Sequence, residues 1–546
     1  MVGMKSTLGA VVVAAGIASA LQPELHDSLL LHGRPQIGLW KALSRQEAQL
    51  STAQHDYQRP LSAEAALSGR YQAHCFDQPI SHFDDSVNGT FCHRYWVDAS
   101  SYKSGGPVFL LDGGETSGAN RLPFLEKGIL QILSNATNGL SVVLEHRYYG
   151  KSVPVSSFST DNLRFLNNAE ALEDSAYFIK HFKPPTSILP LEAAESLHPN
   201  NTAWIYYGGS YAGARAAHMR TQYPELVWGA IASSAVTHAQ VNFPQYFDPI
   251  QEYAPQDCIA AIRSSVKAID SILDMPGPLP GLLKGLFGLA MLEDDDFADV
   301  IQSPLGMWQA KNWDPKVGSD KFQHFCDALT AGGGSSKLGL IRIPSEVANY
   351  AKYIKENIVS RCPEEAGVQE CFGSHDDAKF KDDGLDQEWR LWLFQVCTQW
   401  GYFMPAPLEG PSILSKRLTL EHSSKICRQA YPPGKHFTVP EWPDVEEVNR
   451  RGDYAIQADR LAFMDGDRDP WRPMTPQADS APKRESTIDR PRRIIFDGVH
   501  HYDENGLNNH SHEPERIKEV HAFEVEFIKK WVKDFEKAKL ARRDQQ

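Results

Sequence analysis

A serine lies at the apex of a glycine-rich turn near the middle of the chain, within the run WIYYGGSYAGARAAH at residues 204–218. Four β-favouring residues precede Gly208 and Gly209, and an alanine-rich helical pattern follows Ser210. A strand, a sharp turn with serine at its tip and a helix are the context of a nucleophile elbow, which presents a strained serine hydroxyl. Gly208 has the small size that this turn needs, whereas Ala212 stands where glycine is usual. The alternative is a glycine-rich corner with an ordinary N-cap serine.

Two strand-like runs near the end of the chain each lead into residues that could serve this serine as acid and base. The run LAFM at 461–464 is followed by Asp465, Asp467 and Asp469, and the run RIIF at 493–496 by His500 and His501. The order serine, aspartate, histidine is that of α/β-hydrolases. A neutral imidazole accepts the proton of the serine hydroxyl, and a buried carboxylate fixes the imidazole tautomer. Spacing alone distinguishes neither among the three aspartates nor between the two histidines.

These residues need a sheet that brings the carboxyl ends of distant strands together. Between residues 107 and 232 the pattern alternates, with strands expected at 107–111, 141–144, 204–207 and 227–232 and a helix at 168–182. Such alternation predicts a parallel sheet covered by helices on both faces. The pattern returns after residue 440 and ends in a long amphipathic helix. We expect its apolar stripe to lie in the core: Val520, Phe523, Phe527, Trp531 and Phe535.

The stretch between the two β/α parts has a different character. From about 240 to 440, helix-like segments alternate with Pro- and Gly-rich breaks, and six of the eight cysteines fall there. We therefore predict an α/β-hydrolase fold with a large, mainly helical cap inserted between the nucleophile and acid strands. The expected parts are a signal peptide (1–20), an N-terminal arm or pro-segment (21–69), a hydrolase domain in two pieces (70–239 and 441–546) and the disulfide-containing cap (240–440).

The beginning of the chain has the features of a secretory signal. Lys5 precedes an apolar stretch at 8–17, and Ala18-Ser19-Ala20 forms a small-x-small cleavage site. The apolar stretch is shorter than the roughly 20 residues that span a bilayer, so no membrane anchor is expected. Eight cysteines fit an oxidising compartment, but they allow about 105 pairings, so their connectivity stays open. We expect a secreted protein, or one in the lumen of an acidic vacuolar or lysosomal compartment.

The composition argues against several classes of protein. With 42% hydrophobic and 23% charged residues, the chain is typical of a globular protein rather than a disordered or membrane-spanning one. A net charge of −14 argues against nucleic acid as a partner. The sequence has no C-x-x-C pair, which removes the simplest zinc and redox sites, and we expect neither a metal nor a cofactor. Four sequons predict glycosylation at Asn88, Asn135, Asn200 and Asn509.

Six short motifs lie between about residue 75 and residue 502: FDQPISHF (76–83), TFCHRYW (90–96), EHRYYGKSVP (145–154), GGSYAG (208–213), DPW (469–471) and HH (500–501). Together they resemble the lysosomal Pro-Xaa carboxypeptidase family of serine peptidases, which includes prolyl carboxypeptidase, dipeptidyl peptidase II and the secreted acid prolyl endopeptidases. The EHRYYG block is the most specific of them. The resemblance implies an α/β-hydrolase domain with a helical cap, cleavage after proline, and a peptide or protein as the substrate.

The resemblance also assigns roles to individual residues. It implies Ser210 as nucleophile, Asp469 as the acid partner and His500 as the base. It places the oxyanion hole at the amide of Tyr211 and at the loop that contains Gly114. The Tyr211 amide also follows from its position at the start of a helix, where backbone N–H groups have no partner within the helix.

The chain departs from the family pattern beside the base and in the cap. The continuation Tyr502-Asp503-Glu504 replaces the HHxDL of several members, and Gln399 stands where many members have glutamate. Glu115 is a candidate for binding a substrate amine, and stabilisation of its own loop is the alternative. Carboxypeptidase, dipeptidyl peptidase and endopeptidase activity all remain open, as does the oligomeric state. Two other functions stand beside peptide hydrolysis: hydrolysis of esters or lipids, and binding by a catalytically silent hydrolase fold.

Overall fold

A computed structural model of the chain describes residues 37–39, 41–43, 67, 69–332, 336–338 and 341–544. The expected signal peptide at 1–20 lies outside these residues, as does most of the N-terminal arm expected at 21–69. Within the described ranges, no helix is long and apolar enough to cross a membrane.

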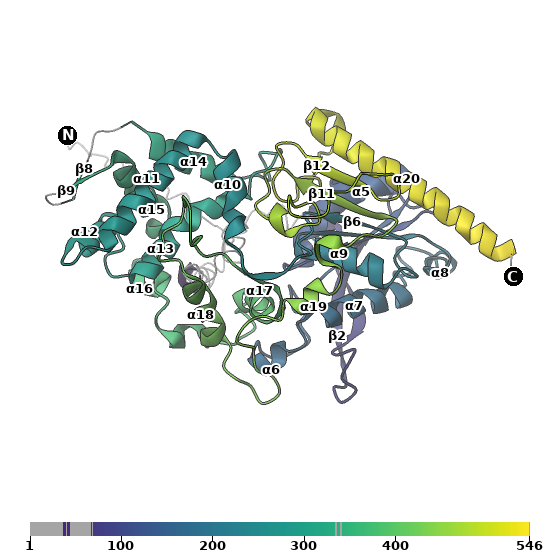
Figure 1. Cartoon of the computed structure of the whole chain (residues 1–546). Helices are drawn as coiled ribbons and strands as arrows, with labels where there is room; N and C mark the ends of the chain where they lie inside the picture. Colours follow the sequence, from purple (N-terminus) through teal and green to yellow (C-terminus); the bar gives the residue numbers. More distant parts are fainter. Residues whose placement is uncertain are drawn as a thin grey trace, which may run out of the picture.

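A twisted sheet of eight strands forms the centre of the hydrolase part, in the order β1-β2-β4-β3-β5-β6-β11-β12 (Figure 1). The six strands from β4 to β12 run parallel, whereas β1 and β2 add an antiparallel edge. The predicted parallel sheet is therefore confirmed, with an antiparallel pair beside it. The strand bounds are β1 (His74–Pro79), β2 (Thr90–Asp98), β3 (Val108–Asp112), β4 (Leu140–Leu144), β5 (Trp204–Gly209), β6 (Gly229–Ser233), β11 (Leu461–Gly466) and β12 (Arg492–Ile495).

Helices cover both faces of this sheet, which is why its central strands are continuous apolar runs. Side chains alternate along each strand: Leu110 and Tyr206 belong to the core under α7 and α9, whereas Phe109 and Tyr207 belong to the core under α5 and α20. The helices of the hydrolase part are η1 (Gly118–Arg121), α4 (Leu122–Glu126), α5 (Ile129–Thr137), α6 (Thr160–Leu163), α7 (Asn168–His181), α8 (Leu191–Glu195), α9 (Tyr211–Gln222), α19 (Glu446–Asn449), η7 (Asp453–Ala455), η8 (Arg472–Met474), η9 (His510–His512) and α20 (Glu515–Asp544).

The C-terminal helix α20 lies along one face of the sheet (Figure 1). Val520, Phe527, Trp531 and Phe535 are all at most 3% exposed. Phe527 and Trp531 belong to the core under this face of the sheet, and Phe523 is partly buried against that core. The apolar stripe is therefore part of the core, as its helical spacing predicts.

The segment between β6 and β11 is mainly helical, and Figure 1 shows α11 to α16 gathered at the side of the molecule away from α20. Its buried residues form one core that also includes Tyr211, Trp471 and Tyr502 of the hydrolase part. The insertion therefore packs against the loops that carry the candidate site. Its elements are β7 (Gln240–Asn242), η2 (Pro244–Phe247), α10 (Asp248–Tyr253), α11 (Gln256–Leu273), α12 (Leu279–Leu286), α13 (Asp294–Gln302), η3 (Ser303–Trp308), α14 (Lys321–Thr330), β8 (Ser336–Leu338), β9 (Ile341–Ile343), α15 (Ser345–Asn357), η4 (Val359–Arg361), α16 (Gly367–Phe372), η5 (Asp377–Phe380), α17 (Trp389–Gln395), a π-helical turn η6 (Val396–Trp400), β10 (Gly401–Phe403) and α18 (Leu420–Ala430).

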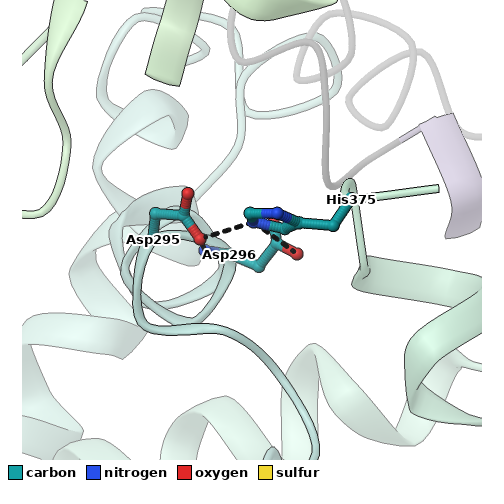
Figure 2. A group of neighbouring side chains, drawn as sticks. All are labelled: Asp295, Asp296 and His375. Atoms are coloured by element: carbon teal, nitrogen blue, oxygen red, sulfur yellow. Dashed lines mark hydrogen bonds and ion pairs between the residues drawn. The ribbon is translucent and has the colours of Figure 1, made fainter. Parts of the chain in front are cut away.

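Disulfides and ion pairs hold the insertion together. All eight cysteines are paired, as Cys75–Cys92, Cys258–Cys326, Cys362–Cys371 and Cys397–Cys427. The first joins β1 to β2, and the other three lie within the helical segment. An ion-pair cluster links Asp295 and Asp296 of α13 to His375, which follows α16 (Figure 2). The domain limits at 239–240 and 440–441 remain predictions.

Candidate active site

Ser210 occupies a strained turn between β5 and α9. Its backbone lies at φ 57° and ψ −120°, a left-handed region that residues with a side chain rarely adopt. The Ser210 side chain accepts no capping hydrogen bond from the backbone N–H groups of α9 among the described residues, which argues against the ordinary N-cap. A Cβ on Gly208 would lie 2.0 Å from the carbonyl oxygen of Ala212, so glycine is required there. The methyl group of Ala212, where glycine is usual, faces Gly114, which has no side chain.

Asp469 and His500 come together at the carboxyl ends of β11 and β12. His500 Nδ1 lies 3.0 and 2.9 Å from the two oxygens of Asp469, whose side chain is fully buried. The Trp471 amide donates to the same carboxylate at 2.9 Å, and the hydroxyl of Ser234 is a further partner. Burial opposes ionisation of Asp469, but His500 and these hydrogen bonds outweigh it, so its pKa is lower than usual. The pair can hold one imidazole tautomer, with Nδ1 as the donor.

The other members of the two clusters have different partners. Asp465 belongs to β11 itself and accepts a hydrogen bond from Gln477 Nε2 at 2.6 Å. Burial raises the pKa of Asp465 to about 7. His501 Nδ1 lies 3.2 Å from Glu504 Oε2. The structure therefore selects Asp469 and His500 as the aspartate–histidine pair, a choice that sequence spacing left open.

The His501–Glu504 pair lies directly against the elbow and was not foreseen from the sequence. A Cβ on Gly209 would lie 2.2 Å from Glu504 Oε1 and 3.0 Å from the His501 ring, so a side chain at this position would displace the pair. The rings of His500 and His501 are 4.1 Å apart between centroids. The unusual Tyr502-Asp503-Glu504 continuation was the one sequence signal that could have pointed to this pair.

The two amides expected in the oxyanion hole differ in their surroundings. Tyr211 is the first residue of α9, where the backbone N–H has no partner within the helix. Gly114 has φ 66°, and its N–H donates to Asp112 Oδ1 at 3.0 Å. That bond must open or be shared before the Gly114 amide can bind an oxyanion. Both oxyanion-hole roles remain predictions.

Asp112 and Glu115 continue the loop after β3. Asp112 accepts from Tyr206 at 2.7 Å and pairs with Arg215 at 3.1 Å, so its charge is neutralised within the core. Glu115 is partly exposed. Burial raises the pKa of Glu115, against the nearby charges of Arg121 and His501. Its carboxyl therefore lies among the groups around the elbow, and its substrate-binding role is a prediction.

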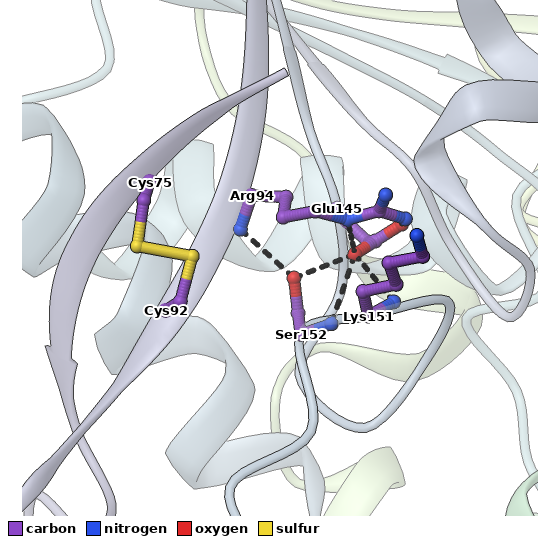
Figure 3. Close-up of a disulfide and its surroundings, with 6 residues drawn as sticks. All are labelled: Cys75, Cys92, Arg94, Glu145, Lys151 and Ser152. Carbon is purple, nitrogen blue, oxygen red and sulfur yellow. Dashed lines mark hydrogen bonds and ion pairs between the residues drawn. A yellow bond between two sulfur atoms is a disulfide. The ribbon is translucent and has the colours of Figure 1, made fainter.

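The EHRYYG block fixes a second loop beside the elbow. Figure 3 shows the Glu145 carboxylate between Arg94, Ser152 and the backbone of Lys151, next to the Cys75–Cys92 disulfide. The following residue, His146, lies 2.9 Å from the Tyr211 hydroxyl through Nε2. The block is thus a buried polar framework that holds the residue after Ser210.

The helical insertion contributes residues that position the acid and base loops. Trp308 Nε1 donates to the carbonyl of Arg468 at 2.8 Å, and Trp313 Nε1 donates to that of Tyr502 at 3.1 Å. The Trp471 indole donates to Gln309 Oε1 at 2.8 Å. None of these contacts follows from local sequence, because each joins residues more than a hundred positions apart.

Other predicted sites have the following surroundings. The four sequon asparagines, Asn88, Asn135, Asn200 and Asn509, are all exposed, which glycosylation requires, and their modification remains a prediction. Gln399 accepts a hydrogen bond from the amide of Asn168, at the start of α7, at 2.9 Å. This contact gives Gln399 a structural role.

Within the described residues, one group offers three metal-ligating atoms within 4.8 Å of one another: Asp295, Asp296 and His375 (Figure 2). Its carboxylates already bond to protein groups. Asp295 accepts from His375 at 2.9 Å and from His422 at 2.8 Å, and Asp296 accepts from the Ser374 amide at 2.8 Å. The group joins cap elements and contains no member of the Ser210, Asp469 and His500 set.

Sheet order, elbow and the sequence order of serine, aspartate and histidine define an α/β-hydrolase with a helical insertion. The profile of the family described as serine carboxypeptidase S28 matches residues 78–523. The chain belongs to this family and is a serine-type peptidase. The family that the six motifs indicate is therefore confirmed.

Two fungal relatives show how much of the chain is shared. A protein of Arthroderma benhamiae named "probable extracellular serine carboxypeptidase" is 39% identical over 522 residues, which cover 89% of this chain and 71% of that protein. Serine protease vicPa of Bipolaris victoriae is 27% identical over 492 residues, 86% of this chain and 90% of its own. A solved proline iminopeptidase of Mycobacterium smegmatis overlaps with a TM-score of 0.35 at 12% identity, over 83% of this chain and 97% of that one.

Proposed function

We propose that this chain is a secreted serine peptidase that hydrolyses peptide bonds after proline, with Ser210 as nucleophile, His500 as base and Asp469 as its carboxylate partner. The observation that carries the proposal is the bond from His500 Nδ1 to the buried Asp469 carboxylate at 2.9 Å. These two residues follow β11 and β12, which belong to the same parallel sheet as β5, the strand that leads into the strained Ser210, with β6 between β5 and β11. A buried aspartate that holds a histidine through Nδ1 leaves Nε2 as the atom that takes a proton.

The reaction follows from these groups. Neutral His500 takes the Ser210 hydroxyl proton as the oxygen attacks the scissile carbonyl carbon. The Tyr211 amide, with one from the Gly114 loop, stabilises the oxyanion that forms. The imidazolium returns the proton to the departing amine, and the acyl-enzyme remains on Ser210. Water, deprotonated by His500, then attacks the ester and releases the acid and the free serine.

Support for the substrate and the location comes from the family. The family's description names carboxypeptidases, and the motifs resemble enzymes that cleave after proline. Four disulfides fit an oxidising compartment, and the name of the 39% identical relative includes the word extracellular. In this proposal Glu115 binds a substrate amine near the elbow.

The test is turnover of a peptide that contains a single internal proline, with products identified by mass spectrometry. Ser210→Ala is expected to lose on the order of 10⁶-fold in kcat and all labelling by a fluorophosphonate probe. The same peptide with a blocked amino or carboxyl end separates the three modes of cleavage. Retention of most activity by Ser210→Ala would show that another residue is the nucleophile. Faster turnover of short acyl esters than of any proline peptide would instead favour an esterase.

A further inference from the structure

Two histidine–carboxylate pairs lie side by side at the elbow, and the proposed function uses only one of them. His500 pairs with Asp469, and His501 pairs with Glu504 at 3.2 Å. The two imidazole rings are 4.1 Å apart with 34° between their planes. The side chains of His501 and Glu504 are 19% and 5% exposed. At that distance, and largely away from water, a charge on one ring acts strongly on protonation of the other.

The second pair is held in place by its surroundings. The His501 amide donates to Ser234 Oγ at 3.2 Å, and the same hydroxyl bonds to Asp469. Gly209 leaves the space into which Glu504 and the His501 ring fit. His501 Nε2 is buried, and no described residue is its hydrogen-bond partner. Ser234 thus connects the two pairs.

The charged groups around the second pair come from four elements. His501 faces Glu504 and His500 from its own loop, Arg121 from η1 and Glu115 from the loop after β3. Glu504 faces His501, His500 and Arg121, and also Asp503 beside it and Glu524 on α20. Burial lowers the pKa of His501, but Glu504 and Glu115 raise it above the usual value despite Arg121.

We propose that Glu504 and His501 form a positioning pair that places a cation against His500 and so keeps His500 neutral, and able to act as base, in acidic solution. This inference rests on the proposed role of His500. His501 carries the positive charge, and Glu504 stabilises that charge. Asp469 orients the tautomer of His500. The pair acts on His500 through space and does not touch the substrate.

The balance of charges on His500 agrees with this role. Burial lowers the pKa of His500, Asp469 raises it, and His501 lowers it again. A base with a lowered pKa becomes protonated, and inactive, only at a lower pH. Loss of the His501 cation therefore shifts the acid limb of the kcat/KM profile to higher pH. Loss of Glu504 alone is expected to shift the acid limb less than loss of His501. Glu504 stabilises the His501 cation, but it also raises the pKa of His500 directly, so the two effects of its removal oppose each other.

The experiment measures kcat/KM against pH for His501→Gln, Glu504→Gln, the double variant and His501→Lys. We expect His501→Gln to lose about tenfold in kcat/KM near pH 5 while changing less than about twofold at pH 7, a shift of about one unit in the acid limb. The acid limb of the double variant is expected to shift less than that of His501→Gln. In His501→Gln the unpaired Glu504 anion also raises the pKa of His500, and in the double variant this anion is absent. His501→Lys restores the cation and the wild-type acid limb. A purely structural role would not produce this order.

The matched control is His510→Gln, since His510 and Glu513 have the same spacing of three residues and a contact of 2.7 Å. It is expected to leave the profile unchanged. An acid limb that stays in place, or moves to lower pH, in His501→Gln and Glu504→Gln overturns the inference. Where a variant is unstable, titration of the His500 ring by NMR in a Ser210→Ala background, with and without the change at residue 501, measures the same effect on the protonation of His500. His500→Gln separates the two proposals: if it retains activity, the proposed base is wrong.

Discussion

Two buried carboxyl groups near the proposed active site have opposite surroundings. Asp469, after β11, is fully buried and receives His500, the Trp471 amide and the Ser234 hydroxyl. Glu524, on α20, is also fully buried, but neither of its oxygens has a hydrogen-bond partner among the described residues. The pKa of Asp469 lies below its usual value. Burial, together with the nearby carboxyls of Asp503 and Glu504, raises the pKa of Glu524 well above its usual value.

The difference shows that partners, and not burial alone, decide the charge of an interior carboxyl. Asp469 is an anion that can stabilise an imidazolium. The raised pKa of Glu524 favours its neutral form, and its ionisation would add an uncompensated charge near Asp503 and Glu504. In the proposed function Asp469 takes part in the reaction as an anion, whereas we expect Glu524 to make the stability of the fold depend on pH.

Within this comparison, the largest expected effect comes from removing the charge of Asp469. Asp469→Asn keeps the volume but offers an amide group to His500 Nδ1, which favours the wrong tautomer. We expect kcat to fall about 10⁴-fold with little change in fold, measured on a proline-containing peptide and by circular dichroism. Asp467→Asn, on the same loop, is the control and is expected to stay near wild-type activity. A loss of tenfold or less in Asp469→Asn would contradict the assigned role.

Glu524→Gln tests the other side of the comparison. A carboxyl whose folded pKa is raised stabilises the fold below its unfolded pKa, near 4.5, and loses that contribution as the pH rises towards the folded pKa. The wild type is therefore expected to lose stability above about pH 5. Glu524→Gln cannot ionise and should be more stable than wild type at pH 8 by about 1–3 kcal/mol.

Denaturant unfolding at pH 4.5 and pH 8 measures this difference. Glu526→Gln is the matched control, because Glu526 lies two residues further along the same helix and is exposed. It is expected to unfold like the wild type at both values. If the stability difference between Glu524→Gln and wild type were the same at pH 4.5 and pH 8, Glu524 would not be the titrating group.

The smallest expected effect concerns the contact between the helical insertion and the loop that carries Asp469. Gln309 Oε1 accepts from the Trp471 indole and from the Tyr246 hydroxyl. Gln309→Ala removes both bonds, each with a net value of about 1 kcal/mol, and is expected to lower kcat about five- to tenfold without changing the pH profile. Gln323→Ala, on the exposed surface of α14, is the comparison. Unchanged kcat in Gln309→Ala would mean that the acid loop holds its position without the insertion.

Much of the fold could be predicted because its signals are local. The strand at 204–207 extends to Gly209, and the helix begins at Tyr211, immediately after the turn. The stripe from Val520 to Phe535 is buried as its period requires. The sequence did not predict the antiparallel direction of β1 and β2, because strand direction depends on pairing partners that residue patterns do not reveal.

The sequence by itself determined the elbow, the order of serine, aspartate and histidine, and the helical character of the insertion, since each depends on residues close together in the chain. Only the tertiary structure decided that Asp469 rather than Asp465 meets His500, that Glu504 holds His501 against the elbow, and how the eight cysteines pair. These choices depend on distances between remote segments and on which charged groups lie together in the interior. The spacing of residues along the chain specifies neither the distances nor the neighbouring charges.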